Sequence, residues 1–176
     1  VLHRLFLSPL PDSDVLLAVL RMYALIFDAV WKSVLVTHGS VPILLLHLGS
    51  ADDSVVESVL SIVLQIVRIP EAGVCVLLKA LTTRQKMTSG SSRLAPLYDL
   101  IVTRRNVKAF SVFNTVIDQM KTQDRIDFRS ELFALHESGA KALIEVLNEI
   151  PEMSQELDTF LDALKEDSGK KAALPV

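Results

Sequence analysis

Few residues of this chain have the types and spacing that catalysis or metal binding requires. The four histidines are His3, His38, His47 and His136, and none has another ligand type three or four residues away in a zinc-binding pattern. His136 is followed by Glu137 but lacks the second histidine of a zinc-protease helix. We therefore expect no metal site, and we expect these histidines in loops or on helix surfaces.

Candidate nucleophiles are equally sparse. The single cysteine, Cys75, lies in the apolar run Val74-Cys-Val-Leu-Leu78, a context that predicts a thiol of blunted nucleophilicity. One cysteine cannot form a disulfide within the chain, which favours a reducing, cytoplasmic setting. Ser89-Gly-Ser-Ser92 lacks the Gly-Lys-Ser/Thr of a phosphate-binding loop, and we expect residues 87–93 to form a surface loop. The sequence therefore predicts a protein that is not an enzyme and that uses no cofactor.

Composition narrows the fold class and the partners. Of the 176 residues, 50% are apolar and only 6% are aromatic, a mix suited to aliphatic contacts between helices. The formal charge is −3 with no long basic block, so we expect no nucleic-acid partner.

Arg21 and Gln65 interrupt two of the most apolar runs, so we expect no transmembrane segment. Val1 leads directly into apolar sequence, which we interpret as a fragment whose upstream part is missing.

Apolar residues recur at helical spacing along most of the chain. Between residues 54 and 69 they repeat every three or four positions, and Ser54 and Glu57 have the spacing of a capping box. Gly39 and Gly49 stand where C-terminal helix caps belong. We predict helices over residues 13–27, 29–37, 41–48, 53–69, 71–82, 92–103, 106–121, 124–136, 139–149 and 152–166.

Short helices that follow one another in pairs indicate stacked helical repeats. We predict an all-α, armadillo-like α-solenoid of stacked short helices over residues 1–167, followed by a C-terminal tail at 168–176. An irregular helical bundle is the alternative that this pattern leaves open. Large side chains at helical spacing are expected in the core rather than in a ligand site, and these are Phe110, Phe113, Met120, Met153 and Phe160.

The last third of the chain carries a distinctive series of motifs. Arg129-Ser-Glu-Leu132 lies in one predicted helix, and Ala142-Leu-Ile-Glu-Val-Leu-Asn-Glu-Ile150 forms the next. Glu156-Leu-Asp-Thr-Phe-Leu-Asp-Ala-Leu-Lys-Glu-Asp167 then ends in acidic residues. The stretch from Phe128 to Asp167 resembles the end of the regulatory armadillo domain of formins, the Diaphanous-inhibitory or formin homology 3 region.

The resemblance extends upstream with lower specificity. Gly73-Val-Cys-Val-Leu-Leu-Lys-Ala-Leu81 and Val112-Phe-Asn-Thr-Val-Ile117 are similar to earlier helices of that family. The chain departs from the family at Leu25-Ile-Phe27, where the family has Met-Asn-Asn, and at Gln65, where it has a small residue. Both departures fall where related domains receive their inhibitory peptide.

The resemblance implies a regulatory protein-interaction domain of a formin. Together with upstream sequence, such a domain binds a Rho-family GTPase, and it binds a C-terminal autoinhibitory segment of the same formin. It thereby controls actin filament assembly, which implies a location in the cytoplasm, at the actin cytoskeleton or cell cortex. The alternative is a constitutive armadillo/HEAT-type scaffold that localises its host protein.

Two polar stripes form the candidate peptide-binding groove. An amphipathic helix lying across them would bond to Gln65 and Asn114, and its acidic residues would meet Arg68 and Lys108. The alternative is that both stripes are solvated helix faces, and the family register favours the groove. The candidate groove residues are Ser61, Gln65, Arg68, Lys108, Ser111, Asn114 and Thr115.

Overall fold

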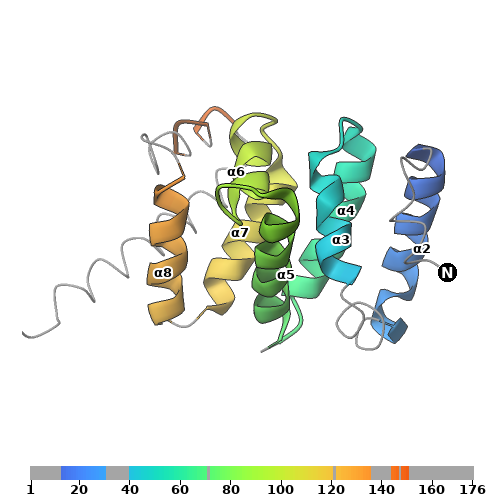
Figure 1. The fold of residues 1–176 in the computed structure, drawn as a ribbon, viewed down its shortest axis with the longest axis horizontal. Helices are drawn as coiled ribbons and strands as arrows, with labels where there is room; N and C mark the ends of the chain where they lie inside the picture. The colour runs from blue at the N-terminus through green and yellow to red at the C-terminus, as the bar shows by residue number, and fades with distance from the viewer. Residues whose placement is uncertain are drawn as a thin grey trace, which may run out of the picture. The chain divides into compact units, whose positions relative to one another are not determined.

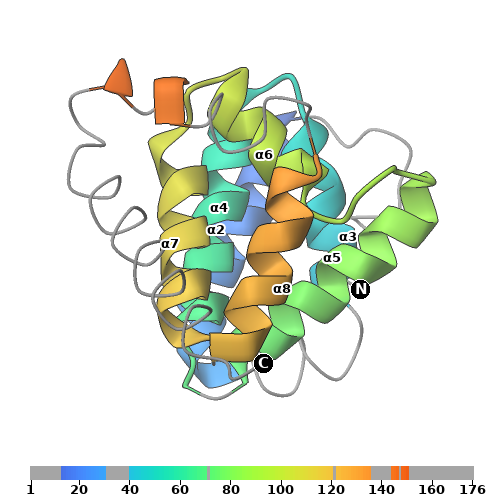
Figure 2. The same ribbon diagram turned by 90° about the vertical axis from the view of Figure 1, so that its left-hand side faces the viewer.

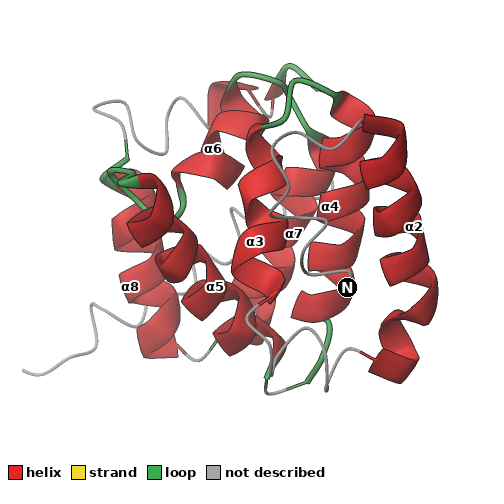
Figure 3. Ribbon diagram, turned by 45° about the vertical axis from the view of Figure 1, so that its right-hand side comes forward, coloured by secondary structure: helices red, strands yellow, loops and turns green. Residues whose placement is uncertain are grey.

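Helices account for all the regular secondary structure that can be described. No strand occurs among the residues that the computed structural model describes, which are 13–30, 40–70, 72–120, 122–135, 144–146 and 148–150 (Figure 3). The predicted all-α class is therefore confirmed for this part of the chain. None of the helices described here is both long enough and apolar enough to cross a membrane.

The chain divides into two compact units, Val1–Pro96 and Leu97–Val176. The described elements of unit 1 are α2 (Ser13–Val30), α3 (Ser40–Leu46), the short 3-10 helix η2 (His47–Gly49), α4 (Asp53–Val67) and α5 (Gly73–Thr88). Helix α6 (Ala95–Val102) begins at the division, and unit 2 continues with α7 (Val107–Gln119) and α8 (Thr122–Phe133).

Helices two positions apart along the chain pack together in unit 1. Helix α2 contacts α4, and α3 contacts α5, while α4 also contacts α5 and η2. In the view of Figure 1, α4 lies between α2 and α5. Every apolar residue of α4 except Leu64 is buried, because the residues repeat at helical spacing and face neighbours on several sides. Helix α4 is therefore the centre of the unit 1 core.

The start of α4 differs from the predicted capping box. Helix α4 begins at Asp53, and the Asp52 carboxylate accepts a hydrogen bond from the Ser54 backbone amide at 2.9 Å. Ser54 therefore lies inside the helix, and the predicted Ser54–Glu57 box is wrong. An acidic side chain one residue before the helix both caps a free amide and interacts favourably with the helix dipole.

The turn from α4 to α5 depends on a glycine. The Gly73 amide donates to the Ile69 carbonyl at 3.0 Å, which brings the first turn of α5 against the last turn of α4. A Cβ atom at Gly73 would lie 2.1 Å from the Ile66 carbonyl oxygen and 2.7 Å from the Val67 carbonyl oxygen. Glycine is therefore required here by the close approach of two backbones.

Helix α5 runs further than predicted. We expected it to end at residue 82 and a loop to span 87–93, but the helix continues to Thr88. Ser89 then adopts a left-handed conformation with φ of 52°, and the Gly90 amide donates to the Gln85 carbonyl at 3.1 Å, as in a Schellman cap. The polar residues after position 82 do not stop the helix: the Thr83 hydroxyl donates to the Lys79 carbonyl in the preceding turn, and Arg84 Nε donates to the Leu45 carbonyl of α3.

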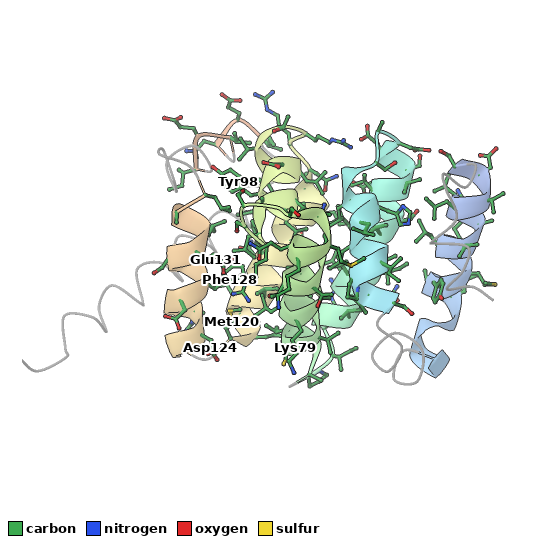
Figure 4. All side chains as sticks on the ribbon, viewed as in Figure 1. Lys79, Tyr98, Met120, Asp124, Phe128 and Glu131 are labelled. Atoms are coloured by element: carbon green, nitrogen blue, oxygen red, sulfur yellow. The ribbon has the colours of Figure 1, made fainter. Side chains whose placement is uncertain are left out.

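The core of unit 2 joins α7 to α8. The rings of Phe113 and Phe128 meet edge to face, with centroids 5.8 Å apart and an interplanar angle of 80°. Figure 4 labels Phe128 on α8. Phe110 and Phe113 are fully buried and Met120 is nearly so, which confirms their predicted core role. Helix α7 starts after Asn106, whose side chain accepts from the Ala109 amide at 2.9 Å. Figure 2 brings α7 and α8 into view together.

Other predicted boundaries have mixed outcomes. Helix α2 is continuous through Val30, so the predicted break after residue 27 is wrong; no glycine or proline interrupts that segment.

Gly49 has no left-handed φ, and the chain instead leaves η2 through Ser50 in an extended conformation. Residues 144–146 and 148 are helical, inside the predicted 139–149 helix. Outside the described residues lie Gly39, Met153, Phe160, the predicted 152–166 helix and the 168–176 tail.

Candidate functional site

No metal-binding cluster occurs in the part of the chain that the structure describes. No group of three His, Cys, Asp or Glu side chains lies close enough there to hold a metal ion. The Cys75 thiol is exposed on α5, so the expectation of an apolar environment is wrong. The run around it is apolar in sequence, but Gly73, Leu77 and Ala80 form the buried edge of α5, and Cys75 lies on another side.

His47 is the one histidine among the described residues. It lies in η2 and is half-buried, and burial lowers the pKa of its imidazole. A lowered pKa keeps the ring neutral at physiological pH, which suits a packed position. His3, His38 and His136 lie outside the described residues.

The first candidate stripe lies along α4. Ser61 and Gln65 are half-buried and Arg68 is exposed, so the three form an accessible line beside the buried apolar residues of the helix. The Ser61 hydroxyl donates to the Glu57 carbonyl at 2.8 Å. The Gln65 amide can both donate and accept, while Arg68 supplies positive charge at the end of the line.

The second candidate stripe lies along α7. Lys108, Ser111, Asn114 and Thr115 are all half-buried. The Ser111 hydroxyl donates to the Val107 carbonyl at 3.2 Å, and the Thr115 hydroxyl donates to the Ser111 carbonyl at 2.8 Å. The Oδ1 atom of Asn114 is buried, although the residue as a whole is partly accessible. Asn114 therefore lies at the border between the accessible face and the core of unit 2.

Each stripe is thus assembled within its own unit. Ser61, Gln65 and Arg68 share one face of α4 in unit 1, as their spacing of four and three residues predicts. The second group, Lys108, Ser111, Asn114 and Thr115, shares one face of α7 in unit 2. Each group presents hydroxyl or amide acceptors next to one cationic side chain. This chemistry suits the polar groups and acidic side chains of a peptide.

Two further residues belong to these faces and were not predicted. Leu64 is half-buried on α4, three residues after Ser61 and four before Arg68, so it adds an apolar contact beside the polar line. Asp118 is exposed on α7, four residues after Asn114 and seven after Ser111, and it adds negative charge. Helical spacing from the groove residues could have identified both Leu64 and Asp118. They were left out because the predicted groove included only uncharged polar and basic residues.

Tyr98 is a buried phenol that sequence reasoning also missed. It lies on α6 with 5% of its surface exposed, and its hydroxyl has no hydrogen-bond partner among the described residues. Burial raises the pKa of this hydroxyl, and the neighbouring Asp99 carboxylate raises it further. The phenol therefore stays protonated.

Comparison with known proteins gives no match: no protein-family model, no curated protein and no solved structure matches this chain.

Proposed function

We propose that this chain is a regulatory domain of a formin, a non-catalytic armadillo-like solenoid that captures a helical peptide. In this proposal it binds the C-terminal autoinhibitory segment of the same formin and, with upstream sequence, a Rho-family GTPase. Binding of that segment would hold the actin-assembling part of the protein inactive, at the actin cytoskeleton or cell cortex. The resemblance of the last third of the sequence to formins suggests the family, and the surface chemistry of α4 and α7 supports the activity.

The observation that carries the proposal is that α4 and α7 share the same surface chemistry. Each helix buries nearly all its apolar residues and leaves accessible a line of hydroxyl, amide and cationic side chains, with Leu64 beside the line of α4 and Asp118 beside the line of α7. A polar line is also the ordinary solvent-facing side of an amphipathic helix, so what supports the proposal is the chemistry of these lines, which suits the polar groups of a bound peptide. Gln65 is half-buried beside the core, where its amide can reach a bound backbone, and Asn114 is also half-buried, but its Oδ1 atom is buried and does not face a bound peptide.

The packing in unit 1 is compatible with stacked repeats. The contacts of α2 with α4 and of α3 with α5 join equivalent helices of successive pairs, which is the arrangement that repeat domains use. In a repeat domain one helix of each pair lines a concave surface. In unit 1 we propose α4 for such a surface, and in unit 2, taken by itself, we propose α7.

A modest affinity is sufficient for the proposed regulation. A peptide segment in the same polypeptide has an effective concentration of the order of millimolar, so a micromolar site stays occupied. A GTPase that binds the open form better than the closed form shifts the population towards the open form. Opposite charges would strengthen binding of the segment in the closed form, because Arg68 and Lys108 would face acidic residues of the segment.

The test is a titration of this chain with a fluorescent peptide that spans the C-terminal autoinhibitory segment of the full-length protein. We expect Gln65→Ala and Asn114→Ala each to weaken binding about fivefold, the effect of losing roughly 1 kcal/mol of hydrogen bonding. Thr83→Ala on α5 and Ser130→Ala on α8 are matched controls, since both residues are exposed outside the proposed surface.

Two outcomes would contradict the proposal. Equal binding by the two groove variants and the wild type would remove the groove assignment. No binding by the wild type, together with capture of a cortical partner through the same residues, would favour the constitutive scaffold instead.

A further inference from the structure

The end of helix α5 carries an exposed serine behind two basic residues. Ser89 caps the C-terminus of α5, is exposed to solvent and has a left-handed φ of 52°. Arg84 and Lys86 stand five and three residues before it. No other Ser or Thr of the sequence has Lys or Arg at both of these positions. One class of serine/threonine kinase selects its acceptors by such residues, because acidic groups beside the kinase active site bind them.

The neighbouring hydroxyls fit this pattern less well than that of Ser89. The Thr88 hydroxyl donates to the carbonyl four residues earlier at 3.0 Å. Ser92 is half-buried, and its hydroxyl oxygen accepts from the amide two residues later at 3.2 Å. Ser91 is exposed, but Thr88 rather than a basic residue stands three positions before it. Accessibility and charge pattern therefore both favour Ser89 as an acceptor.

The last turn of α5 can open at little cost, which a kinase requires because it binds its substrate as an extended segment. Leu81 is the last buried residue of α5, and Met87 is 51% exposed. Unwinding the turn before Ser89 therefore removes little apolar contact. The Gln85 side chain ties this turn to the loop through two exposed hydrogen bonds of 3.3 Å, which water can replace.

The two basic residues differ in how they are held. Lys86 is exposed, so its ammonium group can reach a kinase directly. Arg84 is half-buried, and its Nε atom donates to the Leu45 carbonyl of α3 at 2.9 Å. We therefore expect Lys86 to contribute more to recognition than Arg84.

We propose that Ser89 is a phosphorylation site for a serine/threonine kinase that selects basic residues before its acceptor. The Ser89 hydroxyl oxygen forms a bond to the γ-phosphorus of ATP as the bond from that phosphorus to the β–γ bridging oxygen breaks. ADP leaves, and the hydroxyl proton passes to the kinase. This inference is independent of the proposed peptide-binding function.

The phosphate would loosen the last turn of α5. It adds a charge of about −1.5 to −2 at the C-terminal end of a helix, where the helix dipole is already negative. The single positive charge of Lys86, three residues earlier, offsets only part of it. The regulated element is therefore the end of α5 and the turn that follows it.

The test is phosphorylation of the whole chain by a purified kinase of this basic-selective class, with Mg²⁺ and radiolabelled ATP, followed by mass spectrometry to locate the phosphate. The wild type should be phosphorylated at Ser89. Ser89→Gly should take up no phosphate, and glycine is the replacement because it accepts the left-handed φ. Ser91→Gly removes a neighbouring exposed hydroxyl and should leave the uptake unchanged.

Lysine variants test the recognition. Lys86→Gln should lower kcat/KM about tenfold, the effect of one lost charge contact, whereas Lys86→Arg should keep the wild-type rate. Lys79→Gln is the matched control, since Lys79 is exposed on the same helix but lies ten residues before the acceptor, and it should react like the wild type.

Hydrogen exchange measures the consequence for α5. The amides of Ser89 and Gly90 both donate to the Gln85 carbonyl, and after phosphorylation they should exchange about fivefold faster, with the Leu81 amide unchanged. No uptake by the wild type, or uptake that survives Ser89→Gly, would overturn the proposal. So would equal rates for Lys86→Gln and Lys79→Gln, or amides of Ser89 and Gly90 that exchange no faster.

Discussion

Replacing Gly73 by alanine tests the packing that sets the position of α5. The added Cβ would lie 2.1 Å from the Ile66 carbonyl oxygen and 2.9 Å from the Val67 carbonyl carbon, both inside the 3.0 Å limit that real Cβ contacts respect. Both atoms belong to the backbone at the end of α4, so no side-chain rotation relieves the clash. The first turn of α5 must move instead, and it carries the hydrogen bond from the Gly73 amide to the Ile69 carbonyl.

Overpacking of this kind typically costs about 1–3 kcal/mol. Alanine recovers at most about 1 kcal/mol through its better helix propensity, and less at a first helical position. We therefore expect Gly73→Ala to lower the free energy of unfolding by about 2 kcal/mol, measured by urea unfolding followed by circular dichroism at 222 nm.

Gly49→Ala is the matched control. No heavy atom lies within 4 Å of a Cβ built at Gly49, and its φ is not left-handed. This variant should be neutral or slightly stabilising, by up to about 0.5–1 kcal/mol, because alanine restricts the unfolded chain. If Gly73→Ala were as stable as Gly49→Ala, the close approach of α4 and α5 would be refuted.

The remaining predictions also concern stability. Ser89→Gly should raise the free energy of unfolding by about 1 kcal/mol in the same urea assay, because it relieves a left-handed φ of 52°, whereas Ser91→Gly should not. Tyr98→Phe should stabilise unit 2 by about 1 kcal/mol, because it removes a buried hydroxyl that has no partner among the described residues. Since the pKa of Tyr98 is raised in the folded state, the wild type loses stability as pH rises above about 10, and the advantage of phenylalanine should widen there; a constant difference would contradict this. Since the pKa of His47 is lowered, the unfolded state takes up the proton first, and stability falls as pH drops below about 6.5. His47→Gln should lose less stability than the wild type between pH 7 and 5 in the same assay, and parallel curves would refute the assignment.

Local pattern was enough to predict the helices and much of the core. The apolar spacing from residue 54 to 69 predicted α4, and the spacing of Phe110, Phe113 and Met120 predicted the buried side of α7. These features depend on which residues share a helix face, which sequence spacing determines directly.

Features that depend on how the helices pack against one another could not be predicted from local sequence spacing. The role of Gly73 depends on how closely two helices approach, and the exposure of Cys75 depends on which side of α5 meets a neighbour. The burial of Asn114 Oδ1 likewise depends on where α7 borders the core. The start of α4 at residue 53 was predicted, but its cap was assigned to Ser54 because Asp52 and Ser54 offer competing signals two residues apart.

The central claim is that the polar line of α4 in unit 1 and the polar line of α7 in unit 2 each bind peptide, and amide NMR tests it most directly. In a ¹⁵N-labelled sample titrated with the C-terminal segment peptide, we expect the largest shifts at Gln65, Arg68, Ser111 and Asn114. Residues on the outer side of α5, such as Thr83, should stay unchanged. Shifts concentrated on α5 or α8 with α4 and α7 silent, or no shifts at millimolar peptide, would contradict the claim.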